Sequence, residues 1–280
     1  MLNVALLRLL GLYRGSLLLS FHGTDAVMVL AARGMERILW HWLFRRTDAT
    51  IVCSDAIGDR LKKFDPGLKV VTIRNGISPE RLLAEKNSVT DNRWPRERRF
   101  ILNIGAFLHL KGQDILIQAF ARIAADFPDL DLVIIGNHGP AQEGLQSLVA
   151  GLELQGRVRF YVDVPHPEVL AYLEKATVFA FPSRSEGLPI AVLEAGFLGI
   201  PVVASRVGGI PEIINSAKVG ILVEADDDRA LELALRRLLC DADRRALLSK
   251  HLRQRVVAEF TWHRAWQQYF AILKVRSFVP

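Results

Sequence analysis

The sequence predicts an α/β protein with doubly wound parallel sheets, and three observations lead to this class. Short apolar segments alternate with longer amphipathic segments along most of the 280 residues, which is the pattern of repeated βα units. Turn and helix-ending residues, such as Asn75-Gly76 and Gly199 with Pro201, separate these segments. Half of the residues are hydrophobic and 24% are charged, so the chain can bury a large core. Its length suggests two domains.

We expect residues 1–95 to form the first domain, with fewer strands than a sheet covered on both faces usually has. Its expected elements are strands at 16–20, 49–54 and 69–73, and helices at about 2–12, 33–46 and 55–64. Residues 84–99 are polar, rich in charge and without periodicity, which predicts a linker or domain boundary.

We expect residues 96–258 to form the second domain, in which βα units recur regularly. Its expected strands are 100–105, 130–136, 157–162, 177–181, 201–205 and 220–223. Its expected helices are 112–126, 141–153, 167–175, 189–198, 226–239 and 241–258, with a short turn near 210–214. Residues 259–280 follow the last strand, and their aromatic, helical pattern predicts a helix that packs on the other domain.

The charge and cysteine content argues against several classes. Lys and Arg number 36 against 30 Asp and Glu, and the net charge of +6 suits phosphate ligands or an acidic membrane surface. The excess is too diffuse to indicate nucleic-acid binding. Cys53 and Cys240 are far apart, so they indicate neither a disulfide framework nor a metal motif, and we expect a cytoplasmic protein.

The apolar N-terminus is not expected to be a signal peptide, because Arg8 and Arg14 interrupt it and no small-residue cleavage site follows. No run of 18 uninterrupted apolar residues occurs, which predicts no membrane span. The basic, leucine-rich stretch Leu6–Leu19 could touch the inner face of a membrane peripherally. The alternative is an apolar face left uncovered by a missing part of the first domain.

The segment Phe181–Glu212 carries the strongest signal for a site. A strand ending at Phe181 leads through a polar turn into an apolar helix at 189–198, and Glu194 stands in the middle of that helix. A lone carboxylate on a buried helix is costly unless something satisfies it. Glu186 stands at the helix entrance, where the N-terminus can hold a phosphate. Alternatively, Glu186 merely complements the positive helix end.

Ligands of doubly wound sheets bind at the carboxyl ends of the strands, so the loops there hold the other candidates. Gly105 ends a strand and Lys111 opens the next helix, which suits a pyrophosphate, although a solvated lysine would look the same. The glycines at 136–140 and 206–211 could approach a ligand or simply form turns. His22 follows the first strand, where it could transfer a proton or be a turn histidine.

Several familiar chemistries have no sequence signature here. The chain shows no Ser-His-Asp order, no paired cysteine ligands and no HExxH-type metal motif. It also lacks a strand–GxGxxG–helix unit with a downstream acidic residue, which disfavours nicotinamide and flavin cofactors.

Four stretches together resemble the retaining glycosyltransferases of family 4, which have the GT-B fold of two facing Rossmann-like domains. The stretches are SFHGTD (20–25), RNGI (74–77), NIGAFLHLKGQDILIQAF (103–120) and PSRSEGLPIAVLEAGFLGIPVVASRVGGIPEII (182–214). The last contains the family's paired glutamates, with seven residues between them. FTWHRAWQQYF (260–270) resembles the family's C-terminal helix, which crosses back to the first domain.

The resemblance implies a hexosyltransferase-like enzyme of glycan biosynthesis. Such an enzyme moves a sugar from a nucleoside-diphosphate sugar to a glycan, lipid-linked or other hydroxyl acceptor, with retained anomeric configuration and without a metal or other cofactor. The implied catalytic residues are His22, Lys111 and Glu186, and the implied donor-binding residues are Gly105, Lys111, Glu186, Gly187, Leu188 and Glu194.

The resemblance also implies a role for each of these side chains. Lys111 would bind the donor diphosphate and stabilise the charge of the leaving group. Glu186 would contact the transferred sugar, with the two amides that follow it near the phosphates. Glu194 would bind the ribose, and His22 would lie near the reacting carbon.

Three departures from the family pattern affect these expectations. Ala106 stands where the family commonly has Arg, so Lys111 would hold the diphosphate with less help. Val162 stands where the family often has Gly, at the edge that meets the nucleotide base. The family's first domain usually has about four more strands before the one that ends at His22. We therefore expect a first domain that lacks much of its acceptor-binding part.

The sequence is also compatible with two other functions. A truncated, catalytically incompetent module or partner subunit would bind the nucleotide sugar without turnover. A nucleotide-sugar epimerase of the same fold would need further acid and base residues in the cleft, and the sequence shows no clear carboxylate set for them.

Overall fold

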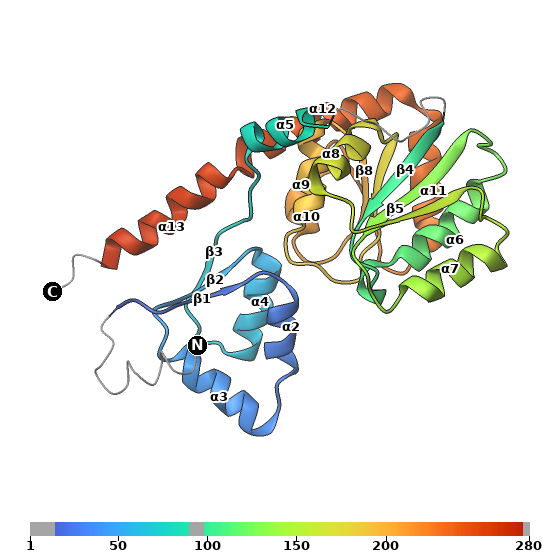
Figure 1. Cartoon of the computed structure of the whole chain (residues 1–280). Coiled ribbons are helices and arrows are strands. Elements are labelled where there is room, and N and C mark those ends of the chain that lie inside the picture. Colours follow the sequence, from blue (N-terminus) through green and yellow to red (C-terminus); the bar gives the residue numbers. More distant parts are fainter. Residues whose placement is uncertain (1–14, 90–97, 277–280) are drawn as a thin grey trace.

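The computed structural model describes residues 15–89 and 98–276, whose strands form two parallel sheets (Figure 1). The smaller sheet has three strands in the order β1-β2-β3. The larger sheet has six strands in the order β6-β5-β4-β7-β8-β9. Neighbouring strands run parallel throughout both sheets. The predicted α/β class with two parallel sheets, the first the smaller, is confirmed.

The smaller sheet begins two residues later than the sequence pattern predicts. Its strands are β1 (Leu18–Phe21), β2 (Ala49–Val52) and β3 (Val70–Thr72), and its helices are α2 (Thr24–Ala31), α3 (Gly34–Phe44) and α4 (Asp55–Phe64). The helix predicted at 2–12 lies outside the described residues. Helix α4 begins where the Ser54 hydroxyl accepts a hydrogen bond from the Ile57 amide, and it buries its apolar face against the sheet.

Two helices fall outside the sequence prediction. Helix α2 follows β1 after a short turn, and its run TDAVMVLA is too uniformly apolar to show a clear helical stripe. Helix α5 (Pro79–Asn87) occupies the beginning of the segment predicted as a linker, so that prediction is wrong for residues 84–87. Pro79 at the start of the helix and Glu80 in its first turn are the signals for a helix there. α5 packs on α8 (His166–Lys175) of the larger half.

The larger half contains the elements that the sequence predicts, within a few residues at each end. Its strands are β4 (Arg99–Ile104), β5 (Leu130–Gly136), β6 (Val158–Val162), β7 (Val178–Phe181), β8 (Val202–Ser205) and β9 (Ile221–Val223). Its helices, besides α8, are the 3-10 turn η1 (His109–Lys111), α6 (Gln113–Ile123), α7 (Gln142–Gly151), α9 (Ile190–Leu198), α10 (Ile210–Ile213), α11 (Asp228–Cys240) and α12 (Ala242–Glu259).

The larger sheet has an apolar core on each face, because successive residues of its strands point to opposite sides. Phe100 and Leu102 of β4 pack with α8 and α9, whereas Ile101 packs with α6, α7 and α11. In chain order, the strands follow the doubly wound order 3-2-1-4-5-6. The direction of winding therefore reverses between β4 and β7, and the loops after these two strands flank the crevice in which such sheets bind ligands.

The last helix, α13 (Trp262–Arg276), leaves the larger half and runs to the smaller sheet (Figure 1). Its Ala265 is buried with Ile51 and Ile73 of the smaller sheet. Where the helix begins, the amide of Ile77 donates to Phe260 O and the amide of Trp262 donates to Ile77 O, both at 2.9 Å. The face of the small sheet opposite α4 is thus covered by the far end of the chain.

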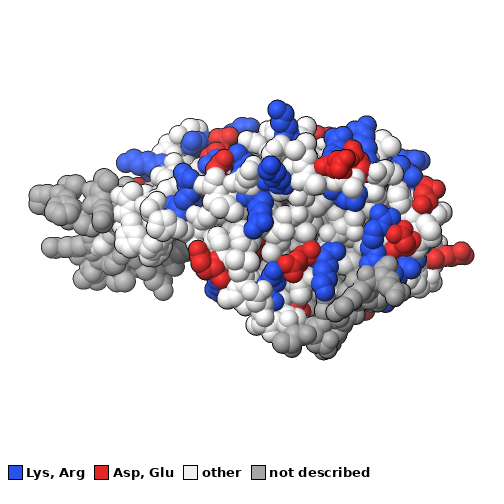
Figure 2. Space-filling model, turned by 90° about the horizontal axis from the view of Figure 1, so that it is seen from above, with Lys and Arg blue, Asp and Glu red and all other residues white. Residues whose placement is uncertain are grey.

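The surface carries both signs of charge side by side. On the face seen in Figure 2, Lys and Arg side chains are interspersed with Asp and Glu, so the net positive charge forms no continuous basic track there. Among residues 15–89 and 98–276, no helix combines the length and the apolar character needed to cross a bilayer.

Candidate functional site

A cavity of about 210 Å³ lies where the loops after β1, β4 and β7 meet. It brings together four of the residues predicted from the sequence: His22, Lys111, Glu186 and Gly187. Gly105, Leu188 and Glu194, which were also predicted, do not line it. The cavity sits at the reversal of strand order, because Lys111 follows β4 and Glu186 follows β7.

The position of Lys111 is set by a close approach of two backbones. Gly112, which follows Lys111 and is the N-cap of α6, has φ of 64°, and a Cβ there would lie 2.0 Å from the carbonyl oxygen of Pro182. A glycine is therefore required at this contact between the loops after β4 and β7. The aliphatic stem of Lys111 passes over Gly105, where an added Cβ would lie 3.4 Å from Lys111 Cγ and Cδ. That distance is an ordinary van der Waals contact, so the path of the lysine stem does not by itself require glycine at position 105.

The two charged residues of the cavity form an ion pair. Lys111 Nζ lies 2.7 Å from Glu186 Oε1, and the two side chains are 25% and 9% exposed. The ammonium also lies 5.8 Å from the ring centre of Phe181, the last residue of β7. An ammonium has three donors, so Lys111 can keep Glu186 and still bind an anion that enters the cavity.

Gly187 lies where the two halves of the molecule touch. A Cβ on Gly187 would lie 2.0 Å from the carbonyl oxygen of His22 and 2.9 Å from Cys53 Sγ. The absence of a side chain therefore lets the loop after β1 pack against the entrance of α9. The family resemblance places this glycine near the donor phosphates, which stays a prediction, and the structure shows that it makes room for the smaller half.

His22 enters the cavity from the smaller half and is exposed. Its Nε2 lies 3.0 Å from Ser20 Oγ, and its amide donates to the carboxylate of Asp25 at 2.9 Å. Cys53 Sγ lies 3.4 Å from its carbonyl oxygen, and burial raises the pKa of that thiol to about 11. The Asp25 carboxylate holds the backbone turn, while the imidazole remains at the mouth of the cavity.

Glu194 is buried on α9, at 7% exposure, as the sequence predicts, but a protein side chain already satisfies it. Its Oε1 lies 2.9 Å from His166 Nε2, at the beginning of α8. His166 Nδ1 in turn lies 2.7 Å from Glu85 Oε2 of α5. Hydrogen bonding to Glu194, and secondarily to Glu85, raises the pKa of His166 to about 9 although its partial burial opposes this. His166 did not stand out in the sequence, because 28 residues separate it from Glu194.

Helix α9 has the features of an anion site at its N-terminus. No described side chain caps it, and its first turn contains no acidic residue. Its N-cap, Pro189, has no N–H of its own, and Leu188 before it is buried, with its carbonyl oxygen accepting from Asn75 Nδ2 at 3.1 Å. The free amides of the first turn, together with the helix dipole, favour a phosphate oxygen there.

Arg184 does not line the cavity but links two of the loops that form it, and no motif in the sequence indicates this role. Its guanidinium forms two parallel hydrogen bonds to Asp114, at 2.8 and 2.7 Å, and a third to Asp226 at 2.6 Å. Another N–H donates to the carbonyl oxygen of His109 at 2.6 Å. Burial alone would raise the pKa of Asp114, but Arg184 holds that pKa below its usual value. Arg184 thereby ties the turn that carries Lys111 to the loop after β7.

Glu212, the acidic residue after the glycine pair 208–209, joins the two halves. Its Oε2 lies 2.7 Å from Arg74 Nε, and its Oε1 accepts from the Ala56 amide at 3.3 Å. Arg74 also pairs with Asp55 of the smaller half. The RNGI stretch therefore supplies inter-half contacts through Arg74 and Asn75.

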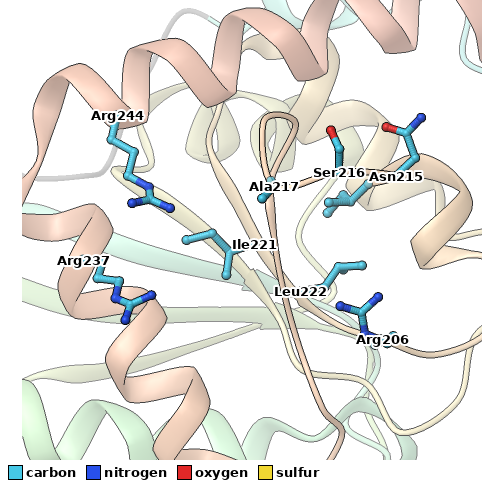
Figure 3. Close-up of a pocket in the computed structure, with 10 residues that line it drawn as sticks. Arg206, Asn215, Ser216, Ala217, Ile221, Leu222, Arg237 and Arg244 are labelled. Atoms are coloured by element: carbon cyan, nitrogen blue, oxygen red, sulfur yellow. The ribbon is translucent and has the colours of Figure 1, made fainter.

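A second cavity, of about 350 Å³, lies away from these residues (Figure 3). It is larger than the first, yet none of the predicted site residues lines it. Arg237 of α11 and Arg244 of α12 approach it from one side, and Arg206 lies on the other side beyond Ile221 and Leu222 of β9. Cavity size therefore does not identify the candidate site, whereas the strand order and the charged pair do.

Comparison with known families gives two matches that together span most of the chain. The family described as "Glycosyl transferases group 1" matches residues 85–255. The family described as "Glycosyltransferase Family 4" matches residues 2–81.

Curated relatives are similar over most of this chain but are longer. A D-inositol 3-phosphate glycosyltransferase of Corynebacterium urealyticum is 28% identical over 88% of this chain and 61% of its own length. A glycogen synthase of Mycobacterium tuberculosis is 31% identical over 79% of this chain and 52% of its own length. The putative colanic acid biosynthesis glycosyltransferase WcaL of Escherichia coli is 31% identical over 92% of this chain and 64% of its own length. The chain thus spans between half and two thirds of these relatives.

Solved structures share the fold. Sucrose-phosphate synthase from Thermosynechococcus elongatus superposes with a TM-score of 0.81 at 25% identity, covering 97% of this chain and 71% of that chain. Anabaena HepE in complex with UDP gives a TM-score of 0.83 at 18% identity, covering 97% and 75%. These neighbours have the GT-B fold, so the predicted GT-B type is confirmed.

Proposed function

The chain belongs to the group 1 glycosyltransferases, and from that premise we propose that it transfers a sugar from a nucleoside-diphosphate sugar to a hydroxyl acceptor. The donor is proposed to bind in the cavity between the loops after β1, β4 and β7. The names of the relatives refer to an inositol phosphate, to glycogen and to the biosynthesis of colanic acid, which are all hydroxyl-bearing compounds. A glycan or lipid-linked hydroxyl is the acceptor class that we propose.

The observation that carries the proposal is the Lys111–Glu186 pair beside the amino end of α9. The ammonium and the amides of the first turn of α9 provide two kinds of positive potential at one edge of the sheet. A diphosphate carries negative charge on several oxygens and fits both. The Glu186 carboxylate lies on the same cavity wall and can accept hydrogen bonds from the hydroxyls of a sugar attached to that diphosphate.

In the proposed reaction, the bond between the anomeric carbon and the β-phosphate oxygen breaks, and its electron pair goes to that oxygen. Lys111 and the α9 amides stabilise the charge that develops there. The acceptor oxygen bonds to the anomeric carbon and its proton passes to the departing phosphate. His22 lines the same cavity as Lys111 and would contact the transferred sugar near the reacting carbon.

Retention of the anomeric configuration and independence from a metal are part of the proposal, supported by the family resemblance. Proton NMR of the first product formed, before anomers equilibrate, tests retention through the coupling constant of the anomeric proton. Activity that is unchanged after dialysis against EDTA tests the second point, and activity restored only by added Mg²⁺ or Mn²⁺ would contradict it.

The main test uses the purified chain with UDP-, GDP- and ADP-sugars, measuring transfer or donor hydrolysis as well as donor binding by calorimetry. We expect Lys111→Ala and Glu186→Ala each to lower turnover at least about 100-fold, as loss of a group that stabilises transition-state charge does. Lys175→Ala at the exposed end of α8 is the matched control and should leave both measurements unchanged. Donor binding that is indifferent to Lys111 and Glu186 would refute the site.

A second candidate function is a donor-binding module that does not turn over by itself. The observation that favours it is the three-stranded first sheet in a chain that covers 52–64% of the length of the relatives named above. It predicts donor binding without transfer, and transfer restored when an amino-terminal half from a longer relative is added. Transfer by the chain alone would dismiss it.

A further inference from the structure

We propose that His166 is a positioning residue of the donor site, which holds the Glu194 carboxylate oriented toward the ribose of the nucleotide. The inference rests on the proposed function, because it names the group that prepares Glu194 for the donor. It adds a residue outside the sequence motifs that led to the family.

The geometry gives His166 a single orientation. It is the first residue of α8, and its two ring nitrogens lie 2.9 Å from Glu194 Oε1 and 2.7 Å from Glu85 Oε2. An imidazole with a carboxylate at each nitrogen donates from both nitrogens when protonated. Its pKa of about 9 means that it carries the proton at neutral pH.

The charges around His166 favour this state from each element that contacts it. Glu194 approaches from α9 and Glu85 from α5, while Arg81 of α5 pairs at 2.6 Å with the other oxygen of Glu85, Oε1. Lys86 of α5 pairs with Glu174 of α8 and fastens the two helices together. The two carboxylates that face His166 outnumber its own positive charge, so the cluster keeps the imidazolium in place.

Glu194 needs such a partner because its neighbours on α9 are apolar. Val192, Leu193 and Ala195 are fully buried, and the Glu194 side chain is 9% exposed. A carboxylate in such a setting is costly unless a hydrogen bond or a cation satisfies it, and His166 supplies both. His166 occupies one lone pair of Oε1, which leaves the other acceptor positions of the carboxylate for the two hydroxyls of a ribose.

Two substitutions separate positioning from mere packing. His166→Ala removes the donor and leaves Glu194 in its apolar surroundings. His166→Gln places an amide N–H near the position of Nε2 without the positive charge, so it should restore part of the effect. His251→Ala is the matched control, since His251 is a half-buried histidine on α12 whose ring bonds a backbone carbonyl, that of Lys218.

The experiment measures binding of UDP, GDP and ADP by calorimetry, and then of the 2′,3′-dideoxy form of whichever binds most tightly. For the natural nucleotide, we expect His166→Ala to weaken binding about 10-fold or more, the usual effect of losing a hydrogen bond to a charged group. His166→Gln should recover part of this loss, and His251→Ala should change nothing. For the dideoxy nucleotide, the effect of His166→Ala should shrink to less than about 2-fold, because the hydroxyls that Glu194 would accept from are absent. Circular dichroism of each variant checks that it is folded.

The possible outcomes are distinct. If His166→Ala weakened the binding of the natural and the dideoxy nucleotide equally, His166 would have a general structural role, and this would overturn the inference. Tighter binding by His166→Ala would make the imidazole a competitor of the ribose and would overturn it too. If the unaltered chain binds none of the three nucleotides, the proposed function fails and the inference falls with it. If it binds one of them and His166→Ala has no effect, the inference alone fails.

Discussion

The two sheets of this molecule are supported in different ways. The six-stranded sheet is covered on both faces by helices that lie within residues 98–259, and most residues of its strands are buried. Within residues 15–89, the helices of the three-stranded sheet lie on one face, and α13 from the far end of the chain covers the other. Every residue of β3 is only half-buried. The larger half is thus self-contained, whereas the smaller half depends on a distant segment.

This difference matters for the site, because the larger half supplies most of it. Lys111, Glu186, Gly187 and Glu194 all come from the six-stranded half, and His22 is the contribution of the smaller one. Changes that disturb only the smaller sheet should therefore affect His22 while leaving the charged pair in position. The following substitutions test this asymmetry.

The largest effect is expected for Ala265→Asp. Ala265 is 3% exposed between Ile51 and Ile73, so a carboxylate there would lose its hydration without gaining a partner. We expect a loss of about 3 kcal/mol in the free energy of unfolding of the smaller half. Hydrogen exchange should lose protection in β1–β3 and keep it in β4–β9. Gln268→Asp, on the exposed side of the same helix, is the control. Equal loss in both sheets would show that the halves unfold as one.

The next effect concerns the contact between the halves. In Gly187→Ala, the new methyl would overlap the carbonyl oxygen of His22, so one loop must shift. We expect about 1–3 kcal/mol of destabilisation, measured by urea unfolding. Gly144→Ala in α7, where an added Cβ meets nothing within 4 Å, should instead stabilise by up to about 1 kcal/mol. If Gly187→Ala and Gly144→Ala both lowered the free energy of unfolding, or both raised it, the close contact at Gly187 would not explain the result.

A smaller effect is expected for Glu212→Gln, which weakens the ion pair with Arg74 across the halves. The arginine side chain is 40% exposed and the glutamate 16%, so solvent screens the pair. We expect a loss of less than about 1 kcal/mol, diminishing further in 1 M salt. Glu224→Gln, whose partner Arg206 is in the same half and exposed, should cost nothing measurable. If Glu212→Gln lowered the free energy of unfolding more than Gly187→Ala does, the ion pair rather than the close backbone contact would hold the two halves together.

The smallest effect is a pH dependence carried by His166. Its pKa rises from 6.5 to about 9 on folding, so the imidazolium stabilises the folded state fully below pH 6.5. That contribution disappears as the pH rises through 9. Between pH 6.5 and 9.5, we expect the Tm of the unaltered protein to fall further than that of His166→Gln, by about 1–2 °C. Parallel curves for the two proteins would show that the imidazolium contributes no stability.

Much of the fold could be predicted because its strands are short apolar runs separated by amphipathic helices. The hydrophobic pattern does not predict α2, because that helix is apolar around most of its circumference. It also does not predict α5, because the charged residues of that helix resemble a linker. In α5 the deciding factor is tertiary: Leu82 is buried and Lys86 reaches Glu174, 88 residues later. Contacts of that kind leave no periodicity in the sequence.

The candidate site could be predicted in part. The strand ends placed Lys111 and Glu186 at the same edge of the sheet, and the structure brings them within 2.7 Å. The expectation that Glu194 needs a partner was sound in physical terms, but His166 could not be found without knowing that α8 begins beside α9. In the same way, the backbone of His22 packs against Gly187, although 165 positions separate the two residues in the sequence. Their spacing in the sequence gives no sign of this contact.

The Lys111–Glu186 ion pair has a further consequence for the cost of binding. Long, flexible side chains normally lose rotamer freedom when they engage a ligand, at about 0.5–1.5 kcal/mol for each one. Here the ammonium and the carboxylate are already held against each other at 2.7 Å in the folded chain. Most of that conformational entropy is therefore lost during folding, and a ligand that reaches the pair meets a preorganised surface.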